Sequence, residues 1–233
     1  MGVCADSDPA LAWTKFIRLG QRVIDVGAHV GTYTREFARR VGPKGTVHAI
    51  EPGPKLFDRL RLEVSDLLNV KLYRYALGNM SGEHRVFHFQ NWTLLPVNEQ
   101  DPRYYSRSYV LNQDQTLKEE FPVLFMTMDE FVAKNGPADW IKVDVDGAEL
   151  EVLRGASMAL RDIRPYWVLE VGKYTMAYFG STPKDLTSLM ESYGYRLYDY
   201  QTYKEMSADQ VEAVIPDSTI DVICAPEERP WPP

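Results

Sequence analysis

The stretch that most constrains the fold is residues 22–31, RVIDVGAHVG. It begins as a short apolar run typical of a buried strand, passes through Asp25 and Gly27, and ends in a turn at Gly31. A helix over 32–40 is predicted to follow, because apolar residues recur there at helical spacing after a polar start. Glycines at a strand-to-helix turn let the backbone approach a ligand, and the free N–H groups of the helix start can hold it.

A second apolar run, TVHAIE, ends at Glu51, about twenty residues beyond Gly31. A carboxylate at the tip of a second strand is the usual partner of a ribose diol. A dinucleotide fingerprint would read G-x-G-x-x-G, but Gly27 is followed by His29 two positions later and by Thr32 three further on. The pyrophosphate loop is therefore missing, which argues against a nicotinamide dehydrogenase. An ordinary glycine-bearing turn is the alternative, and the register of Glu51 disfavours it.

Strand and helix alternate through the first third of the chain. Strands are predicted at 46–51 and 70–75, with a helix over 55–68 between them. This alternation at short spacing predicts an α/β fold with a Rossmann-like, doubly wound, mostly parallel sheet. Two late strands, 195–200 and 220–225, suit an antiparallel pair that closes such a sheet.

The alternation breaks around residues 84–128, where a β insertion is expected. Residues 85–89 and 123–128 have the pattern of two strands that return beside one another. Residues 90–122 show no sustained periodicity and many aromatic and basic side chains. A loop this long in a compact domain is usually a functional lid or disordered, and we predict that 90–122 is a lid over the substrate, with disorder as the alternative.

Local sequence patterns predict the structure of four further segments. A helix is expected over 9–19, and another over 129–135 with Asp129 as its N-cap. A helix over 182–193 has a proline in its first turn. The proline-rich residues 226–233 are expected to form an extended tail.

The second informative stretch is residues 140–155, WIKVDVDGAELEVLRG. Its first half is a buried strand on which Lys142, Asp144 and Asp146 share one face. Three charges on an apolar central strand are costly unless they are paired or bind a ligand. They are therefore expected at the carboxyl end of the sheet, where open α/β sheets bind ligands, although a Lys–Asp pair that only fixes the strand end is the alternative.

The next strand is predicted over 166–171, YWVLEV, with Glu170 near its carboxyl end. Lys173, Tyr174 and Tyr178 are expected in a loop after it.

Together, VIDVGAHVGTYT…IEPGP and WIKVDVDGAELEVLRGA…LEV resemble the FkbM-type family of class I S-adenosylmethionine-dependent methyltransferases, from about residue 22 to 171. One position departs from the family pattern. The family has K-x-D-x-E-G, and this chain has Asp146 in place of the glutamate, which keeps the charge and shortens the side chain by one methylene.

The resemblance implies methyl transfer from S-adenosylmethionine, usually to a hydroxyl of a sugar, polyketide or other small molecule. It also implies a role for each matching residue. Asp25, Gly27, Ala28, His29 and Gly31 would surround the methionine part of the cofactor, Glu51 would hold the ribose, Ala76 and Leu77 would lie near the adenine, and Asp144 would lie near the sulfonium.

Methyl transfer to an alcohol also needs a base, or a cation that lowers the alcohol's pKa. The catalytic candidates are Asp144, Asp146 and Glu149, with Lys142 to neutralise them or to anchor an anionic substrate. His29 is a further candidate base, although in a glycine turn its backbone is the expected contact. The carboxylates leave room for a divalent metal, but no histidine-rich ligand set favours one and none is expected.

Composition limits the partners and the setting. At 233 residues the chain fits a single methyltransferase domain, 1–233. A net charge of −7 argues against broad attraction to nucleic acid or an anionic membrane. Cys4 and Cys224 have no metal or redox spacing and indicate a reducing compartment. With no signal peptide pattern and no apolar run long enough to span a bilayer, a cytoplasmic location is predicted.

Several functions stay open at this point. The leading one is O-methylation of a small-molecule acceptor. The alternatives are N-methylation, methylation of RNA or a glycan, and a non-catalytic protein that binds the cofactor. Neither the acceptor nor the oligomeric state can be read from the sequence, and a homodimer remains open.

Overall fold

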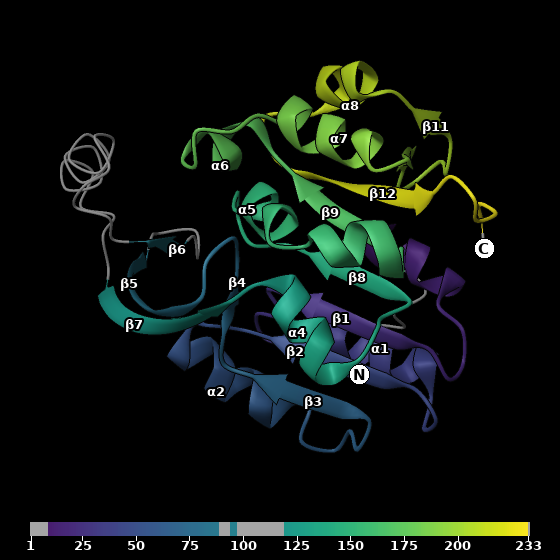
Figure 1. The fold of residues 1–233 in the computed structure, drawn as a ribbon. Coiled ribbons are helices and arrows are strands. Elements are labelled where there is room, and N and C mark those ends of the chain that lie inside the picture. Colours follow the sequence, from purple (N-terminus) through teal and green to yellow (C-terminus); the bar gives the residue numbers. More distant parts are fainter. Residues whose placement is uncertain (1–8, 89–93, 97–118, 233) are drawn as a thin grey trace.

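The computed structural model describes residues 9–88, 94–96 and 119–232. Within them, eight strands form one sheet in the order β11-β10-β12-β9-β8-β1-β2-β3 (Figure 1). Their bounds are β1 Arg22–Val26, β2 Thr46–Ile50, β3 Val70–Tyr73, β8 Trp140–Val143, β9 Tyr166–Val171, β10 Tyr195–Asp199, β11 Glu205–Met206 and β12 Ile220–Pro226. The strands from β3 to β9 pair in parallel, and β12, β10 and β11 pair antiparallel. The predicted doubly wound sheet with an antiparallel closing pair is confirmed.

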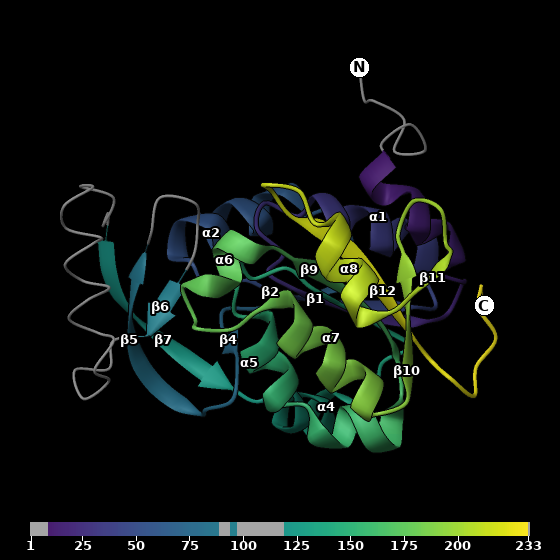
Figure 2. The same ribbon diagram turned by 90° about the horizontal axis from the view of Figure 1, so that it is seen from above.

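Helices cover both faces of this sheet and make three layers (Figure 2). On one face lie α1 and α2, and on the other lie α4, α5 and α7. The helix bounds are α1 Thr32–Val41, α2 Pro54–Glu63, α4 Met128–Asn135, α5 Glu149–Arg154, α6 Lys173–Ala177, α7 Pro183–Ser192 and α8 Ala208–Val214. The central strands are buried on both faces, which explains their near-continuous apolar sequences.

The insertion forms a second, four-stranded sheet in the order β4-β7-β5-β6. Its strands are β4 Ala76–Leu77, β5 Gly82–His88, β6 Leu94–Pro96 and β7 Glu119–Met126. As expected, β5 and β7 pair antiparallel. Of the predicted lid, residues 90–93 and 97–118 lie outside the described residues, while 94–96 and 119–122 belong to strands. The lid therefore stays a prediction.

The helix predicted over 55–68 is shorter than expected, because α2 ends at Glu63. Just beyond it, the Ser65 hydroxyl donates to the carbonyl of Leu62 at 2.8 Å. Serine competes for backbone groups in this way and favours a turn over continued helix.

The predicted cap of α4 is wrong. Thr127 is the N-cap, and its hydroxyl accepts from the backbone N–H of Glu130 while the Glu130 carboxylate accepts from the backbone N–H of Thr127. The T-x-x-E capping box is visible in the sequence. Asp129 instead accepts backbone N–H groups of Met158 and Ala159, 2.8 and 2.9 Å away, and so ties α4 to the segment after α5.

Two other segments differ from expectation. The loop expected around Tyr174 instead contains the short helix α6. Met176 of this helix is completely buried. The helix expected over 9–19 is a 3-10 helix, Pro9–Phe16, in which Trp13 is buried against Phe37 of α1 and Trp140 of β8.

The last described residues pack against the 3-10 helix and the sheet. Pro226 is the last residue of β12, and the Trp231 ring lies 5.0 Å from that of Tyr198 and 5.2 Å from that of Phe16. No helix among the described residues is long and apolar enough to cross a membrane.

Candidate functional site

A cavity of about 360 Å³ opens at the carboxyl ends of the parallel strands, next to the small sheet. This is where an open α/β sheet binds its ligand. Eighteen residues line it: Val26, Gly27, Ala28, His29, Thr32, Tyr33, Ile50, Glu51, Pro52, Leu56, Tyr75, Ala76, Leu77, Phe125, Asp144, Val145, Asp146 and Ala148.

The floor of the cavity is the turn after β1. The backbone N–H groups of Gly27 and Ala28 both donate to the carbonyl of Ile50, at 3.0 and 2.9 Å, which joins β1 to the end of β2. Gly27 has a φ of +84°, and a Cβ there would lie 1.7 Å from the carbonyl oxygen of Asp144. Only glycine fits between the two strand ends, so this residue sets how closely the neighbouring loops approach.

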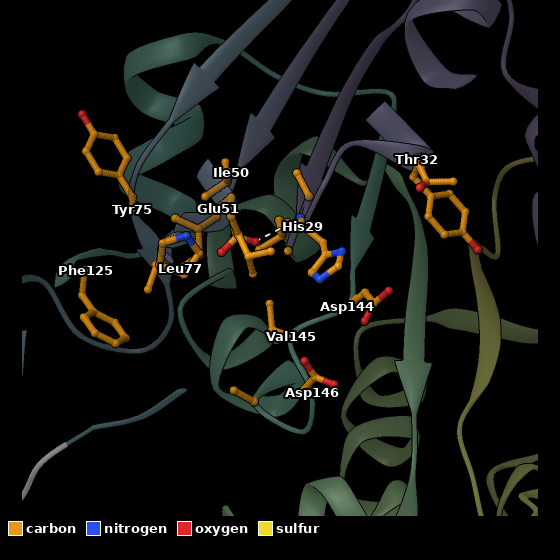
Figure 3. A pocket seen from close by; sticks show the side chains of 18 residues that line it. His29, Thr32, Ile50, Glu51, Tyr75, Leu77, Phe125, Asp144, Val145 and Asp146 are labelled. Atoms are coloured by element: carbon orange, nitrogen blue, oxygen red, sulfur yellow. Dashed lines mark hydrogen bonds between the residues drawn. The ribbon is translucent and has the colours of Figure 1, made fainter. Parts of the chain in front are cut away.

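Glu51 lies at the middle of the cavity and is 5% exposed (Figure 3). One carboxylate oxygen accepts the backbone N–H of His29 at 3.0 Å, and the other accepts that of Gly53 at 2.8 Å. Burial raises the pKa of Glu51 to about 7, against these two hydrogen bonds. Each oxygen can accept a further hydrogen bond, so the oriented carboxylate fits a ribose diol.

One end of the cavity is apolar. Tyr75, Leu77 and Phe125 surround it on the side of Glu51 that faces the small sheet (Figure 3). Leu77 comes from β4 and Phe125 from β7, so the small sheet supplies most of this wall. A flat heterocycle such as adenine fits this chemistry. Tyr75 and Phe125 were not among the residues predicted from the sequence. Phe125 reaches the cavity through the pairing of β4 with β7, which brings distant segments together.

The other end is rich in carboxylates. Asp144 lies on the opposite side of His29 from the apolar wall, and Asp146 lies below His29 in the same view (Figure 3). Asp146 has a φ of +53°, and burial together with the charge of Asp144 raises its pKa to about 7. Burial opposes ionisation of Asp144, but the nearby Lys142 cation outweighs it and lowers the pKa of that carboxyl. The pKa values of the two aspartates are therefore shifted in opposite directions, although both residues belong to one loop.

Lys142 lies beneath the cavity. It is 1% exposed, its Nζ lies 2.6 Å from Oδ2 of Asp144, and it lies 4.1 Å from the centre of the Tyr33 ring. Asp25 pairs with Lys142 in register across β1 and β8 and accepts the Thr34 hydroxyl at 2.6 Å. Burial raises the pKa of Asp25 despite the lysine.

The charged row continues across the sheet from Asp144. Glu170 in β9 pairs in register with Asp221 in β12 and accepts the Thr219 hydroxyl at 2.7 Å. Burial and the charge of Asp144 raise the pKa of Glu170 to about 9. Burial also raises the pKa of Asp221 to about 6, while the Tyr33 hydroxyl donates to that carboxyl at 3.2 Å. Lys142 is thus a buried cation facing more carboxyl groups than it can neutralise.

Glu149 serves the loop and not the cavity. It is 1% exposed, and one oxygen accepts the backbone N–H groups of Val145 and Gly147, at 3.0 and 3.2 Å. Burial raises its pKa to about 7. These hydrogen bonds hold the turn that contains Asp146.

The structure therefore divides the residues proposed from the sequence into two groups. Those that line the cavity are Gly27, Ala28, His29, Glu51, Ala76, Leu77, Asp144 and Asp146. Those that support it without lining it are Asp25, Gly31, Lys142 and Glu149. Gly31 lies where α1 meets α2, since a Cβ there would be 2.8 Å from a methyl of Leu60. Within the described ranges, no three His, Cys, Asp or Glu side chains are grouped to hold a metal ion.

The fold and this cavity define a class I methyltransferase: a parallel doubly wound sheet closed by antiparallel strands, with an acidic residue directly after the second strand. Residues 25–197, more than half of the chain, match the methyltransferase FkbM domain. The chain belongs to the FkbM family of S-adenosylmethionine-dependent methyltransferases.

Two relatives of known name are similar in sequence. The hexuronic acid methyltransferase AglP of Haloferax volcanii is 30% identical over 170 residues, which cover 71% of this chain and 59% of that protein. The methyltransferase sdnD of Sordaria araneosa is 29% identical over 156 residues, which cover 57% of this chain and 59% of that protein. The chain thus spans less than two thirds of either relative.

Two solved structures show the same fold. The FkbM methyltransferase of Methylobacillus flagellatus has a TM-score of 0.53 at 15% identity, covering 88% of this chain and 43% of that one. A precorrin-6y C5,15-methyltransferase of Geobacter metallireducens has a TM-score of 0.50 at 12% identity, covering 93% and 86%.

Proposed function

We propose that this protein transfers a methyl group from S-adenosylmethionine to a hydroxyl group of a small molecule. The observation that carries the proposal is the order of chemistry along the cavity, with an apolar wall, then Glu51, then the Asp144–Asp146 end. That order matches adenine, ribose and the reacting end of the cofactor. A sugar is the leading acceptor class, because one relative is named for methylating a hexuronic acid.

The residues of the cavity divide the work of binding. Glu51 would hold the ribose, and Ala76, Leu77 and Phe125 would contact the adenine. Gly27, Ala28 and the backbone of His29 would lie along the methionine part, and Asp144 would lie near the sulfonium. When bound, the cofactor supplies an electrophilic methyl group on a positively charged sulfur.

Asp146 is the base in this proposal. Its carboxylate would take the proton of the acceptor hydroxyl, whose oxygen would receive the methyl group that the bound cofactor supplies. A base is most effective when its pKa lies near the working pH, and the pKa of Asp146 is raised to about 7 by burial and by Asp144. Glu149 fixes the turn that carries Asp146, and Lys142 keeps Asp144 ionised. Positioning supplies the rest of the acceleration.

The first experiment is calorimetric titration with S-adenosylhomocysteine, NAD and NADP. Micromolar binding of the first and none of the others is expected, because the cavity lacks a pyrophosphate loop. Binding of NAD instead would refute the proposal.

A screen of acceptors then distinguishes the remaining functions. We expect methylation of sugars or other hydroxyl compounds, unchanged by EDTA. Methylation confined to amines or RNA would favour the alternative enzymes, and tight cofactor binding without turnover on any acceptor would favour a non-catalytic binding protein.

A further inference from the structure

Two tyrosines, Tyr174 in α6 and Tyr178 directly after it, pack against each other. The side chain of Tyr174 is 62% exposed, although it is large and aromatic. The Tyr178 ring meets it edge to face, with 4.9 Å between ring centres, and the Tyr178 hydroxyl donates to the Tyr174 hydroxyl. Residues four apart on a helix share one face, so the two rings form a single surface. Tyrosine combines an apolar ring with a polar tip and is enriched at binding surfaces.

This surface begins at the rim of the cavity. A Cβ at Gly147 would lie 2.2 Å from the carbonyl oxygen of Thr175, so the turn after β8 touches the backbone of α6 directly. Gly147 follows Asp146, and Thr175 follows Tyr174. Figures 1 and 2 show α6 at the carboxyl end of β9, on the same edge of the large sheet as the small sheet. The backbone of α6 therefore borders the turn that follows Asp146, and Tyr174 is the exposed residue next to that contact.

The chemistry around this rim points to one kind of ligand. A pyranose ring has an apolar C–H face and a rim of hydroxyl groups. Tyr174 offers a ring face and a polar tip, while Asp144 and Asp146 offer acceptors for hydroxyl donors. A quaternary ammonium group would need several ring faces around it, and here the Tyr174 and Tyr178 rings meet nearly at right angles, at 82°.

We propose that Tyr174 is the stacking platform of the acceptor subsite and that the acceptor is a pyranose sugar whose reacting hydroxyl lies at Asp146. This inference rests on the proposed methyl transfer at the same cavity. It assigns the sugar ring to α6, outside the cofactor cavity, and makes Tyr174 a residue that binds the acceptor without contacting the cofactor.

The test is saturation-transfer NMR on the full chain, with and without S-adenosylhomocysteine. The probes are methyl β-D-glucopyranoside, its uronic acid counterpart, and resorcinol as a flat phenol without a sugar ring. We expect saturable binding of a pyranoside, with strongest transfer to its ring C–H protons, and a preference for pyranoside over resorcinol. The two sugars separate a neutral from an anionic pyranose, and binding of either supports the proposal.

Four variants locate the contact. Tyr174→Ala is expected to weaken pyranoside binding about tenfold through the lost ring, while Tyr174→Trp keeps it within about threefold. Tyr174→Gln keeps a polar tip but loses the ring, so it should behave like Tyr174→Ala. The control is Leu62→Ala, which removes a 70% exposed apolar side chain from α2 and should change nothing. All four should bind S-adenosylhomocysteine as the parent does.

Two results would overturn the assignment: pyranosides that do not bind while resorcinol does, or pyranoside affinity that is equal in the parent and Tyr174→Ala. Failure of the parent to bind S-adenosylhomocysteine would instead refute the proposed function. The two failures are therefore separate measurements.

Discussion

Lys142 and Asp144 form an ion pair whose Nζ–Oδ2 distance is 2.6 Å, with the lysine 1% exposed and the aspartate open to the cavity. Without the lysine, burial would favour the protonated, neutral form of the Asp144 carboxyl. The carboxylates around Lys142 in turn raise the pKa of the lysine. The pair thus delivers a negative charge to the place where a sulfonium is proposed to lie. Its counter-cation never meets the ligand.

Removing the lysine tests the cost of that arrangement. Lys142→Met should lower the free energy of unfolding by about 3–5 kcal/mol, because it leaves buried carboxylates without a cation. Urea denaturation measures this. Adding Asp144→Asn should recover part of the loss. The control is Lys184→Met, since Lys184 makes an ion pair with Asp209 at the same 2.6 Å but in solvent. Equal effects of the two single variants would show that burial of the pair is unimportant.

Glu51 should make cofactor binding depend on pH. Its pKa is about 7, so it is ionised above that pH and protonated below it. Ribose hydroxyls donate best to the ionised form, so the affinity for S-adenosylhomocysteine should rise from pH 6 to pH 8 in calorimetry. Glu51→Ala should weaken binding by about 1.5–3 kcal/mol at pH 8. In Glu51→Gln the pH dependence should vanish, and its persistence would exclude Glu51 as its source.

Asp146 should determine the pH dependence of turnover. Since a base acts when deprotonated, kcat should rise through about pH 7, and Asp146→Asn should lower kcat at least about 100-fold with little change in cofactor affinity. Asp144→Asn provides the comparison. Asp144 raises the pKa of Asp146, so removing its charge should move the rise in kcat to lower pH and also reduce turnover. An unshifted profile in Asp144→Asn would assign the titration to another group.

Gly27 and Gly20 form a natural pair for testing the turn after β1. Their φ angles are +84° and +83°, but a Cβ at Gly20 meets nothing within 4 Å. Gly20→Ala should therefore cost only the backbone strain, about 1–2 kcal/mol of unfolding free energy. Gly27→Ala adds a clash with the carbonyl of Asp144, so it should be more destabilising and should abolish binding of S-adenosylhomocysteine. Equal melting temperatures for the two variants would contradict this close approach.

Local signals in the sequence were sufficient for the parallel sheet and for the Gly27–Glu51 part of the cavity. Gly27 and Glu51 come directly after strands β1 and β2, and strand ends are set by short-range patterns. The apolar wall was not predictable in this way. Phe125 reaches the cavity because two-residue β4 pairs with β7, a contact across almost fifty positions that has no periodic signature.

Burial decides which of the charged candidates reach the cavity and which only support it. The sequence placed Lys142, Asp144 and Asp146 on one face, but it could not show which of them stays under the floor. The register of β8 against β1 decides this, because it sets Lys142 beside Asp25 and leaves Asp144 beyond the last strand residue. Glu149 could act as a catalytic carboxylate by its chemistry alone. It accepts hydrogen bonds from the backbone of Val145 and Gly147 instead, so its role is to hold the loop.

The cavity is shared by two sheets that are otherwise separately hydrogen-bonded. Gly27 and Glu51 follow strands of the large sheet, and Leu77 and Phe125 belong to the small one. A molecule that fills the cavity therefore adds contacts across the seam between them. Local opening of the small sheet would break those contacts, so a ligand that binds the closed form suppresses that opening. Amide exchange in β4 and β7 would then slow together on ligand binding, and the two sheets would come to unfold as one cooperative unit.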